Sequence, residues 1–250
     1  MHFGGTVIDY KGTPDGWVFE PMNVCVQPFF GADEQRNADW LKFGERIVNG
    51  PMPVNVTGVP RIWPEHLSGG NEDSNPNHAL EIHPITKLDD NGTPRDFSTF
   101  VFAPEGLAGI SEGTQSSILG TTAVKVKKSG NIVTITMTTQ NLIGNFADID
   151  VSVAPGTITA LDGGHRMEGE ALIEGGDTFP VRMVSVAGSE IDAKIEAARK
   201  KGDTKNIQLE VLALFSLSPV ALLDAIKPGG RGKVTKPIQL ILYGETDQGQ

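Results

Sequence analysis

The stretch VNVTGVPRIWPEHLSGGNEDSNPNHALEIHPI, residues 54–85, contains the pattern that decides the fold. Apolar and polar residues alternate over residues 53–63 and again over 79–88, as they do in strands with one buried face. The segment 68–77 between them is rich in Gly and Asn, which favour loops. The stretch therefore predicts two β-strands joined by a long loop.

Short strand patterns of the same kind recur along most of the remaining chain, separated by turns rich in Gly, Pro and Asn. Helical spacing of apolar residues is confined to residues 33–48, 189–201 and 219–226, and Ser189 is the expected N-cap of the second of these segments. Strands and helices do not alternate regularly, which argues against a doubly wound nucleotide-binding fold. The sequence therefore predicts an all-β protein with two or three short helices.

The chain has 250 residues, which is enough for two small β domains. Residues 104–119 are rich in Gly and Ser and lack a strong strand or helix pattern, so we expect a linker or domain boundary there. We expect a small β-barrel over residues 1–104. A second antiparallel β barrel or sandwich, containing the amphipathic helix, is expected over residues 105–250.

Composition limits the classes of partner. A net charge of −10 argues against broad, salt-driven binding of nucleic acid and against adhesion to anionic membranes, although it permits a local basic groove. Cys25 is the only cysteine, which excludes an intrachain disulfide and a Cys-rich zinc site. No apolar run is long enough to cross a membrane, and residues 1–10 lack the features of a signal peptide. We expect a cytoplasmic protein, with a trimmed secreted chain as the alternative.

One part of the opening stretch resembles a known group of proteins. Val56, Thr57 and Gly58, followed by HALEIHPI at residues 78–85, resemble small bacterial OB-fold-like modules with a V-x-G strand and an H-x-x-x-E-I-H-P-[VI] strand, although this chain has one residue fewer between His78 and Glu81 than that pattern. The resemblance covers about residues 5–90 and implies an OB-like barrel, without a secure activity. The helix expected at 33–48 precedes the V-x-G strand, whereas the OB helix usually lies between the third and fourth strands.

The first candidate site is one face of the strand expected at 79–88. Residues two apart in a strand share a face, so Glu81 and His83 point to the same side. A hydrogen-bonded pair that supports the fold is one interpretation. Acid–base chemistry or ligand binding by the same two groups is another, because His changes charge near neutral pH.

A metal site is the third interpretation of these residues. His66 and His78 flank the same loop and could join Glu81 and His83, and such His and carboxylate donors suit zinc. This set would make the protein a metal-dependent hydrolase of phosphodiester type. The spacing matches no known metal signature, so we expect no cofactor by default and leave open whether the protein is an enzyme.

Two residues near the end of the first predicted strand are further candidates for ligand binding. Trp63 lies between Pro60 and Pro64, and Arg61 precedes it. An exposed Trp there would be a stacking platform for a base or a sugar. A buried Trp would instead plug the end of the barrel.

A basic segment near the C-terminus is the last candidate. The loop KPGGRGKVTKP, residues 227–237, contains no acidic residue. It is either a solvated hairpin loop or a finger that contacts phosphate, and it is not a P-loop. Lysines of the hairpin expected at 121–139 would extend the basic strip if the two segments meet. The basic residues concerned are Lys227, Arg231, Lys233 and Lys236 of the loop and Lys125, Lys127 and Lys128 of the hairpin.

These observations favour a non-catalytic binding or interaction module. Its ligand or protein partner would be held by the barrel loops and by a face made of Arg61, Trp63, Glu81 and His83. A metal-dependent hydrolase and a protein that binds single-stranded nucleic acid through the basic loop are the alternatives.

Overall fold

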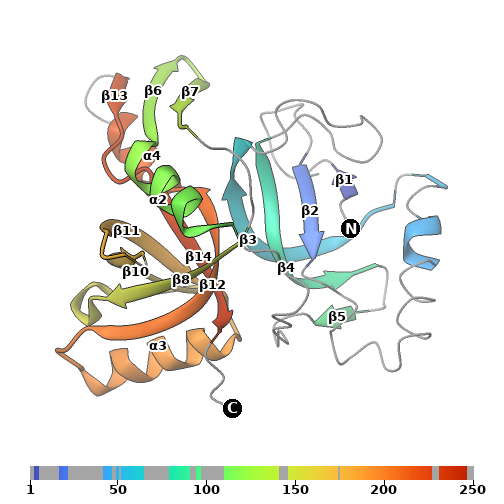
Figure 1. Ribbon diagram of the computed structural model, residues 1–250. Helices are drawn as coiled ribbons and strands as arrows, with labels where there is room; N and C mark the ends of the chain where they lie inside the picture. The colour runs from blue at the N-terminus through green and yellow to red at the C-terminus, as the bar shows by residue number, and fades with distance from the viewer. Residues whose placement is uncertain are drawn as a thin grey trace.

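The fold is mostly β, as the sequence predicts, with short helices at the periphery (Figure 1). The strands form three sheets in the described part of the chain. The structure is a computed structural model, and it describes residues 3–5, 17–21, 42–46, 49–50, 52–64, 79–90, 94–96, 110–140, 146–173, 175–226 and 231–246.

The described strands of the N-terminal half form an open five-stranded sheet in the order β1-β2-β4-β3, with β5 beside β4. The pair β3–β4 is antiparallel and contains both strands predicted from the opening stretch, whereas β2 and β4 are parallel. Residues 42–46 are helical, within the helix predicted at 33–48. The strands are β1 (Phe3–Gly5), β2 (Trp17–Pro21), β3 (Asn55–Ile62), β4 (Leu80–Asp89) and β5 (Pro94–Asp96).

A closed five-stranded barrel occupies the C-terminal half. Each strand pairs with two others in the ring β8-β10-β11-β14-β12, and β12 returns to β8. Every pair in the ring is antiparallel except β11–β14, which is parallel. A short strand, β9, continues the sheet from β10. The strands are β8 (Phe146–Val153), β9 (Thr159–Leu161), β10 (Gly164–Leu172), β11 (Thr178–Ser185), β12 (Ile207–Leu217) and β14 (Ile238–Glu245).

Alternation of side chains explains why these strands form a barrel with a filled interior. In β8, Ala147, Ile149 and Val151 are buried, whereas Asp148 and Asp150 between them are exposed. Inward apolar side chains of all five strands belong to one core cluster. A five-stranded ring is narrow enough for side chains to fill it, so its interior is a packed core.

The helix α3 (Glu190–Lys201) connects β11 to β12 along the barrel and confirms the helix predicted at 189–201. Ser189 caps its first turn, and Gly202 ends it in the left-handed conformation at φ 70°. Its buried residues Ile191 and Ile195 belong to the barrel core. Lysine and arginine in the last turn interact favourably with the helix dipole.

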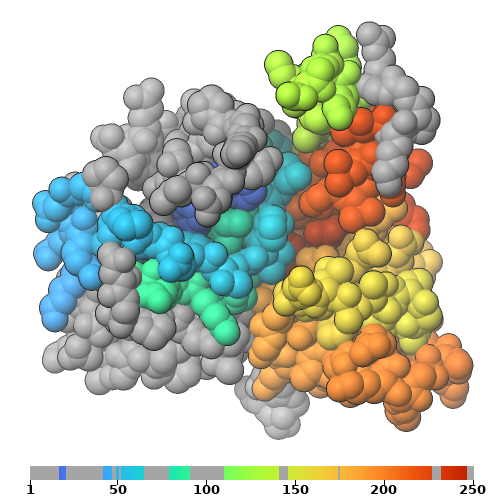
Figure 2. Space-filling view, turned by 180° about the vertical axis from the view of Figure 1, so that it is seen from behind, coloured from blue at the N-terminus to red at the C-terminus, as the bar shows by residue number. Residues whose placement is uncertain are grey.

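A small three-stranded sheet extends from the barrel in the order β13-β6-β7. The hairpin of β6 (Ala123–Ser129) and β7 (Ile132–Thr138) confirms the hairpin predicted there. The third strand, β13 (Arg231–Lys233), follows the helix α4 (Pro219–Ile226), which packs against both β6 and β13. Figure 2 shows the hairpin, in yellow-green, projecting at the top of the molecule.

The segment 104–119, predicted as a linker or domain boundary, contains a helix in its described part. Residues Glu112–Thr121 form the helix α2, capped by the side chain of Ser111. Gln115 and Ile118 are buried, and Ile118 belongs to the barrel core. Gly and Ser have low helix propensity, so the sequence does not predict this helix, although Ser111 followed by Glu112 is a reasonable helix start.

Residues on both sides of the predicted domain boundary share a core. Trp63 of the N-terminal half belongs to the barrel's core cluster, and Val59 packs against a second cluster that contains Leu212 and Leu214. The sheet and the barrel therefore contact each other through β3 and β12. The predicted boundary at residues 104 and 105 lies outside the described residues.

The glycine of the V-x-G motif has a packing role that generates a first prediction. A Cβ atom on Gly58 would overlap the carbonyl oxygen of Pro84 and the side chain of Ile82 on the neighbouring strand. Gly58→Ala should therefore lower the free energy of unfolding by about 1–3 kcal/mol, measured by chemical denaturation.

The matched control is Gly113→Ala in α2, where an added Cβ meets no atom within 4 Å. Removing a helical glycine without a clash should leave stability equal or higher, by up to about 1 kcal/mol. Equal effects of the two substitutions would contradict the packing role of Gly58.

Candidate functional site

The residues predicted on the strand face form a buried polar cluster between the N-terminal sheet and the barrel. Its members are Glu20 of β2, Arg61 of β3, and Glu81 and His83 of β4. Arg61 and Glu81 are direct neighbours in the antiparallel register of β3 and β4. Glu81 and His83 lie two residues apart on one face of β4, as predicted.

Arg61 links the N-terminal sheet to the barrel. Its Nη1 donates a hydrogen bond to Glu81 Oε2 at 2.8 Å, and its Nε donates to the backbone oxygen of Phe215 in β12 at 2.7 Å. Both charged side chains are completely buried. A third hydrogen bond joins the halves, from the backbone N–H of Ile62 to Ser216 Oγ at 3.2 Å. The ion pair therefore holds β3 against the barrel.

His83 lies at the centre of the cluster. Its Nδ1 is 3.2 Å from Glu20 Oε2 and 3.5 Å from Glu81 Oε2. Its ring packs edge-to-face against Phe146 and Tyr243 of the barrel, with ring centroids 5.8 Å and 6.2 Å apart. Its side chain is only 1 % exposed, so bulk solvent does not reach the imidazole.

The predicted binding face is therefore enclosed. The structure brings Arg61, Glu81 and His83 together but turns them toward the barrel, where none of the three is exposed. Trp63 is 0 % exposed and stacks on Phe215 with centroids 6.0 Å apart, so it is no exposed stacking platform. It plugs the contact between sheet and barrel instead, and the Arg61 guanidinium lies 5.8 Å from its ring.

Two of the four predicted metal ligands, His66 and His78, lie outside the described residues. A different acidic residue, Glu20, completes a group of three possible metal donors with Glu81 and His83. Sequence reasoning missed Glu20, although a carboxylate inside the apolar run WVFEP is an available signal.

Tyr243 is a further member that the sequence did not reveal. Burial raises the pKa of the Tyr243 phenol well above its usual value of 10, and the negative charges of Glu20 and Glu81 raise it further, against the opposing effect of Arg61. The pKa of the phenol therefore depends on the charges of Glu20, Arg61 and Glu81, which lie across the contact between sheet and barrel.

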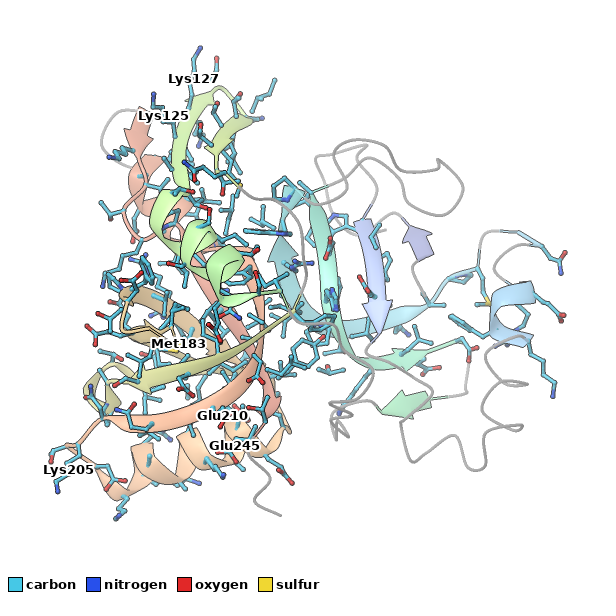
Figure 3. The ribbon with its side chains drawn as sticks, in the orientation of Figure 1. Lys125, Lys127, Met183, Lys205, Glu210 and Glu245 are labelled. Carbon is cyan, nitrogen blue, oxygen red and sulfur yellow. The ribbon has the colours of Figure 1, made fainter. Side chains whose placement is uncertain are left out.

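The hairpin lysines were predicted to extend the basic strip if the hairpin and the loop 227–237 meet, and the two segments do meet. The strand β13 of the basic loop pairs with β6 of the hairpin, so that Lys233 lies opposite Lys125 and Arg231 lies opposite Lys127. Figure 3 shows Lys125 and Lys127 on the projecting end of the molecule. The side chains of Lys227, Arg231 and the loop between them lie outside the described residues.

A shallow groove of about 410 Å³ follows this basic strand pair. Its described lining contains no acidic residue. Lys128 lies outside the lining, and Lys236 pairs instead with Glu168 of β10 at 3.1 Å. The residues that line the groove are Lys125, Val126, Lys127, Thr134, Thr136, Gly232 and Lys233.

A second histidine cluster fastens α3 to the barrel. His165 Nδ1 lies 2.7 Å from Asp192 Oδ1, and its Nε2 lies 2.8 Å from Glu196 Oε2. Ser185 Oγ donates to Asp192 at 2.6 Å and accepts from the backbone N–H of His165. The serine and the imidazole both bond to Asp192, so the cluster connects α3 to β10 and β11. Nothing in the sequence spacing reveals it.

Comparison of the chain with protein-family models, with curated proteins and with solved structures gives no match. Among the described residues, no helix has the length and apolar character needed to cross a membrane.

The buried ion pair generates a second prediction. Arg61→Leu leaves the Glu81 carboxylate buried without its guanidinium and should lower the free energy of unfolding by about 3–5 kcal/mol in chemical denaturation. The double variant Arg61→Leu/Glu81→Leu should lose less than Arg61→Leu alone, because it leaves no unpaired carboxylate at this position.

Arg199→Leu is the control, because Arg199 forms a comparable pair with Glu196 on the exposed surface of α3. It should change stability far less than Arg61→Leu. A double variant less stable than Arg61→Leu would show that the ion pair is not the source of the loss.

The raised pKa of Tyr243 generates a third prediction, on alkaline stability. A phenol whose pKa is higher in the folded than in the unfolded protein stabilises the fold below the unfolded pKa of about 10, and this contribution is lost as pH rises above it. Tyrosinate absorbance should show Tyr243 resisting ionisation in the folded protein, and the free energy of unfolding should fall above about pH 10.

Tyr243→Phe should remove that part of the alkaline loss, leaving Tyr10 as the only tyrosine. The prediction fails if both tyrosines of the folded wild-type protein titrate together at the ordinary value.

Proposed function

We propose that the protein is a non-catalytic module that binds single-stranded nucleic acid in the groove of β6, β7 and β13. One observation carries the proposal: the pairing of β13 with β6 brings Lys233 beside Lys125, in a groove that Lys127 also lines. These residues are about 100 positions apart in sequence, and only the fold makes them one site.

The charge of the groove supports an anionic ligand. Lys125, Lys127 and Lys233 are all exposed, and the described lining has no carboxylate to neutralise them. The groove is thus a local exception to a net charge of −10. Thr134 and Thr136 lie opposite Lys127 and Lys125 in the hairpin and supply hydroxyl donors for phosphate oxygens.

The groove also offers apolar surface. Ile132 is 70 % exposed and pairs with Ser129, which places it at the tip of the hairpin on the same face as the lysines. Single strands combine backbone phosphates with bases that need apolar or stacking partners, and this face provides both kinds of contact. Double-stranded nucleic acid hides its bases and would use the lysines alone.

The order of the barrel strands adds a fold-level analogy. Three antiparallel strands, a helix, and two further strands closed by one parallel pair are the arrangement of an OB-fold, and we infer that β8, β10, β11, β12 and β14 form such a barrel. The loop between its fourth and fifth strands then carries α4 and β13. In OB-folds this loop is one of the two that bind oligonucleotides.

The fourth prediction tests the groove by charge reversal. Lys125→Glu/Lys233→Glu should weaken the binding of a fluorescent single-stranded oligonucleotide at least about tenfold at low salt, measured by anisotropy. The slope of log affinity against log salt concentration should fall by about 0.7 for each phosphate that the variant no longer neutralises.

Lys205→Glu is the control, because Lys205 is equally exposed but lies at the opposite end of the barrel (Figure 3). It changes the net charge by half as much and should reduce affinity only slightly. Absence of oligonucleotide binding by the wild-type protein at low salt would end the proposal, as would an equal loss per charge in Lys205→Glu.

A further inference from the structure

The geometry points to a divalent metal site in the buried polar cluster, with Glu20, Glu81 and His83 as ligands and zinc as the ion that fits them. This site is separate from the groove, and it does not depend on the proposed function. It differs from the set expected from the sequence, because Glu20 of β2 is a ligand.

The distances between the donor atoms fit a tetrahedral ion. Ligands about 2.0–2.1 Å from zinc at the tetrahedral angle are about 3.3–3.4 Å from one another. Nδ1 of His83 lies 3.2 Å from Glu20 Oε2 and 3.5 Å from Glu81 Oε2. All three donor atoms lie within 4.8 Å of one another, which places them around one point.

The imidazole is an independent indication of a ligand. Neither ring nitrogen of His83 makes a hydrogen bond to any described residue, although the side chain is almost fully buried. Buried polar side chains nearly always have a partner, because an unsatisfied one costs about 1–3 kcal/mol. A metal ion held by the Nδ1 lone pair would give that nitrogen a partner, and Phe146 and Tyr243 hold the ring in place.

The charges of the cluster also favour a cation. Glu20 and Glu81 contribute two negative charges, and Arg61 contributes one positive charge that is anchored to Phe215. Among the described members of the cluster, two carboxylates thus lie beside a single guanidinium. Arg61 orients the Glu81 carboxylate as hydrogen-bonded neighbours of metal-binding carboxylates commonly do.

Two carboxylates and one imidazole are the donors of a zinc, manganese or iron site, and the absence of sulfur is consistent with Cys25 being the only cysteine. An ion at this position would join β2 to β4 directly beside the barrel. Its role would be structural, since its surroundings are closed to substrates and metal binding adds to folding stability.

The test is zinc binding by the metal-stripped, full-length protein. Calorimetric titration with zinc chloride should give one ion per chain, and zinc should raise the midpoint of thermal unfolding. Glu20→Gln should weaken zinc binding at least about tenfold. Glu20 is the best position to change, because its side chain is 12 % exposed and glutamine keeps its shape.

Glu210→Gln is the matched control, because it removes one carboxylate from an exposed position on β12. It should bind zinc as the wild type does. X-ray absorption at the zinc edge of the wild-type protein should show one imidazole nitrogen with oxygen donors, a readout that does not depend on how well Glu20→Gln folds.

Absence of stoichiometric zinc binding would overturn the inference, and so would equal affinities of Glu20→Gln and Glu210→Gln. A zinc spectrum without an imidazole ligand would do the same. None of these results affects binding of oligonucleotides in the groove, so the two proposals fail separately.

Discussion

The hydrogen-bonded ion pair of Arg61 and Glu81 is the constraint on which the rest of the structure depends. The guanidinium donates one hydrogen bond to a carboxylate of its own sheet and another to a backbone oxygen of the barrel. Two buried charges are costly to desolvate, and such a pair is tolerated only where each charge has ion-pair or hydrogen-bond partners. The described partners of Arg61 come from both halves of the chain, so placing the sheet against the barrel gives its guanidinium a second acceptor. The aromatic contacts of His83 and the burial of Trp63 follow from that placement.

The strands of the C-terminal barrel form a closed ring. Its single parallel pair, β11 with β14, brings together strands that are separated by α3, β12, α4 and β13 in the sequence. Closing the ring at this pair also fixes the position of β13, which leaves the barrel to extend the β6–β7 hairpin. A surface groove is thus built on elements that are held by a packed core, which suits precise contact with a ligand. The buried polar cluster and the groove lie on different elements and need not communicate.

Local patterns in the sequence predicted most of the elements, because alternation and capping act over a few residues. The shared face of Glu81 and His83 and the cap at Ser189 are of this kind. Partners contributed by distant strands were not predictable: Glu20 joins the cluster only through the parallel pairing of β2 with β4, and His165 meets Asp192 only because α3 folds back on the barrel. The closed barrel in the C-terminal half depends in the same way on pairing across some 50 residues, for which one sequence holds no periodic signal. The sequence predicted a joint basic strip only if the two segments met, and it could not predict that Lys125 would lie opposite Lys233.

Trp63 bears on how this chain can be divided. An indole from the N-terminal half completes the core of the C-terminal barrel, stacked on Phe215 and surrounded by barrel side chains. A fragment beginning after residue 104 would keep every strand of the barrel and lose that side chain, so that Phe215 would border a void or an exposed apolar patch. The core of the C-terminal barrel therefore includes a residue from the N-terminal half.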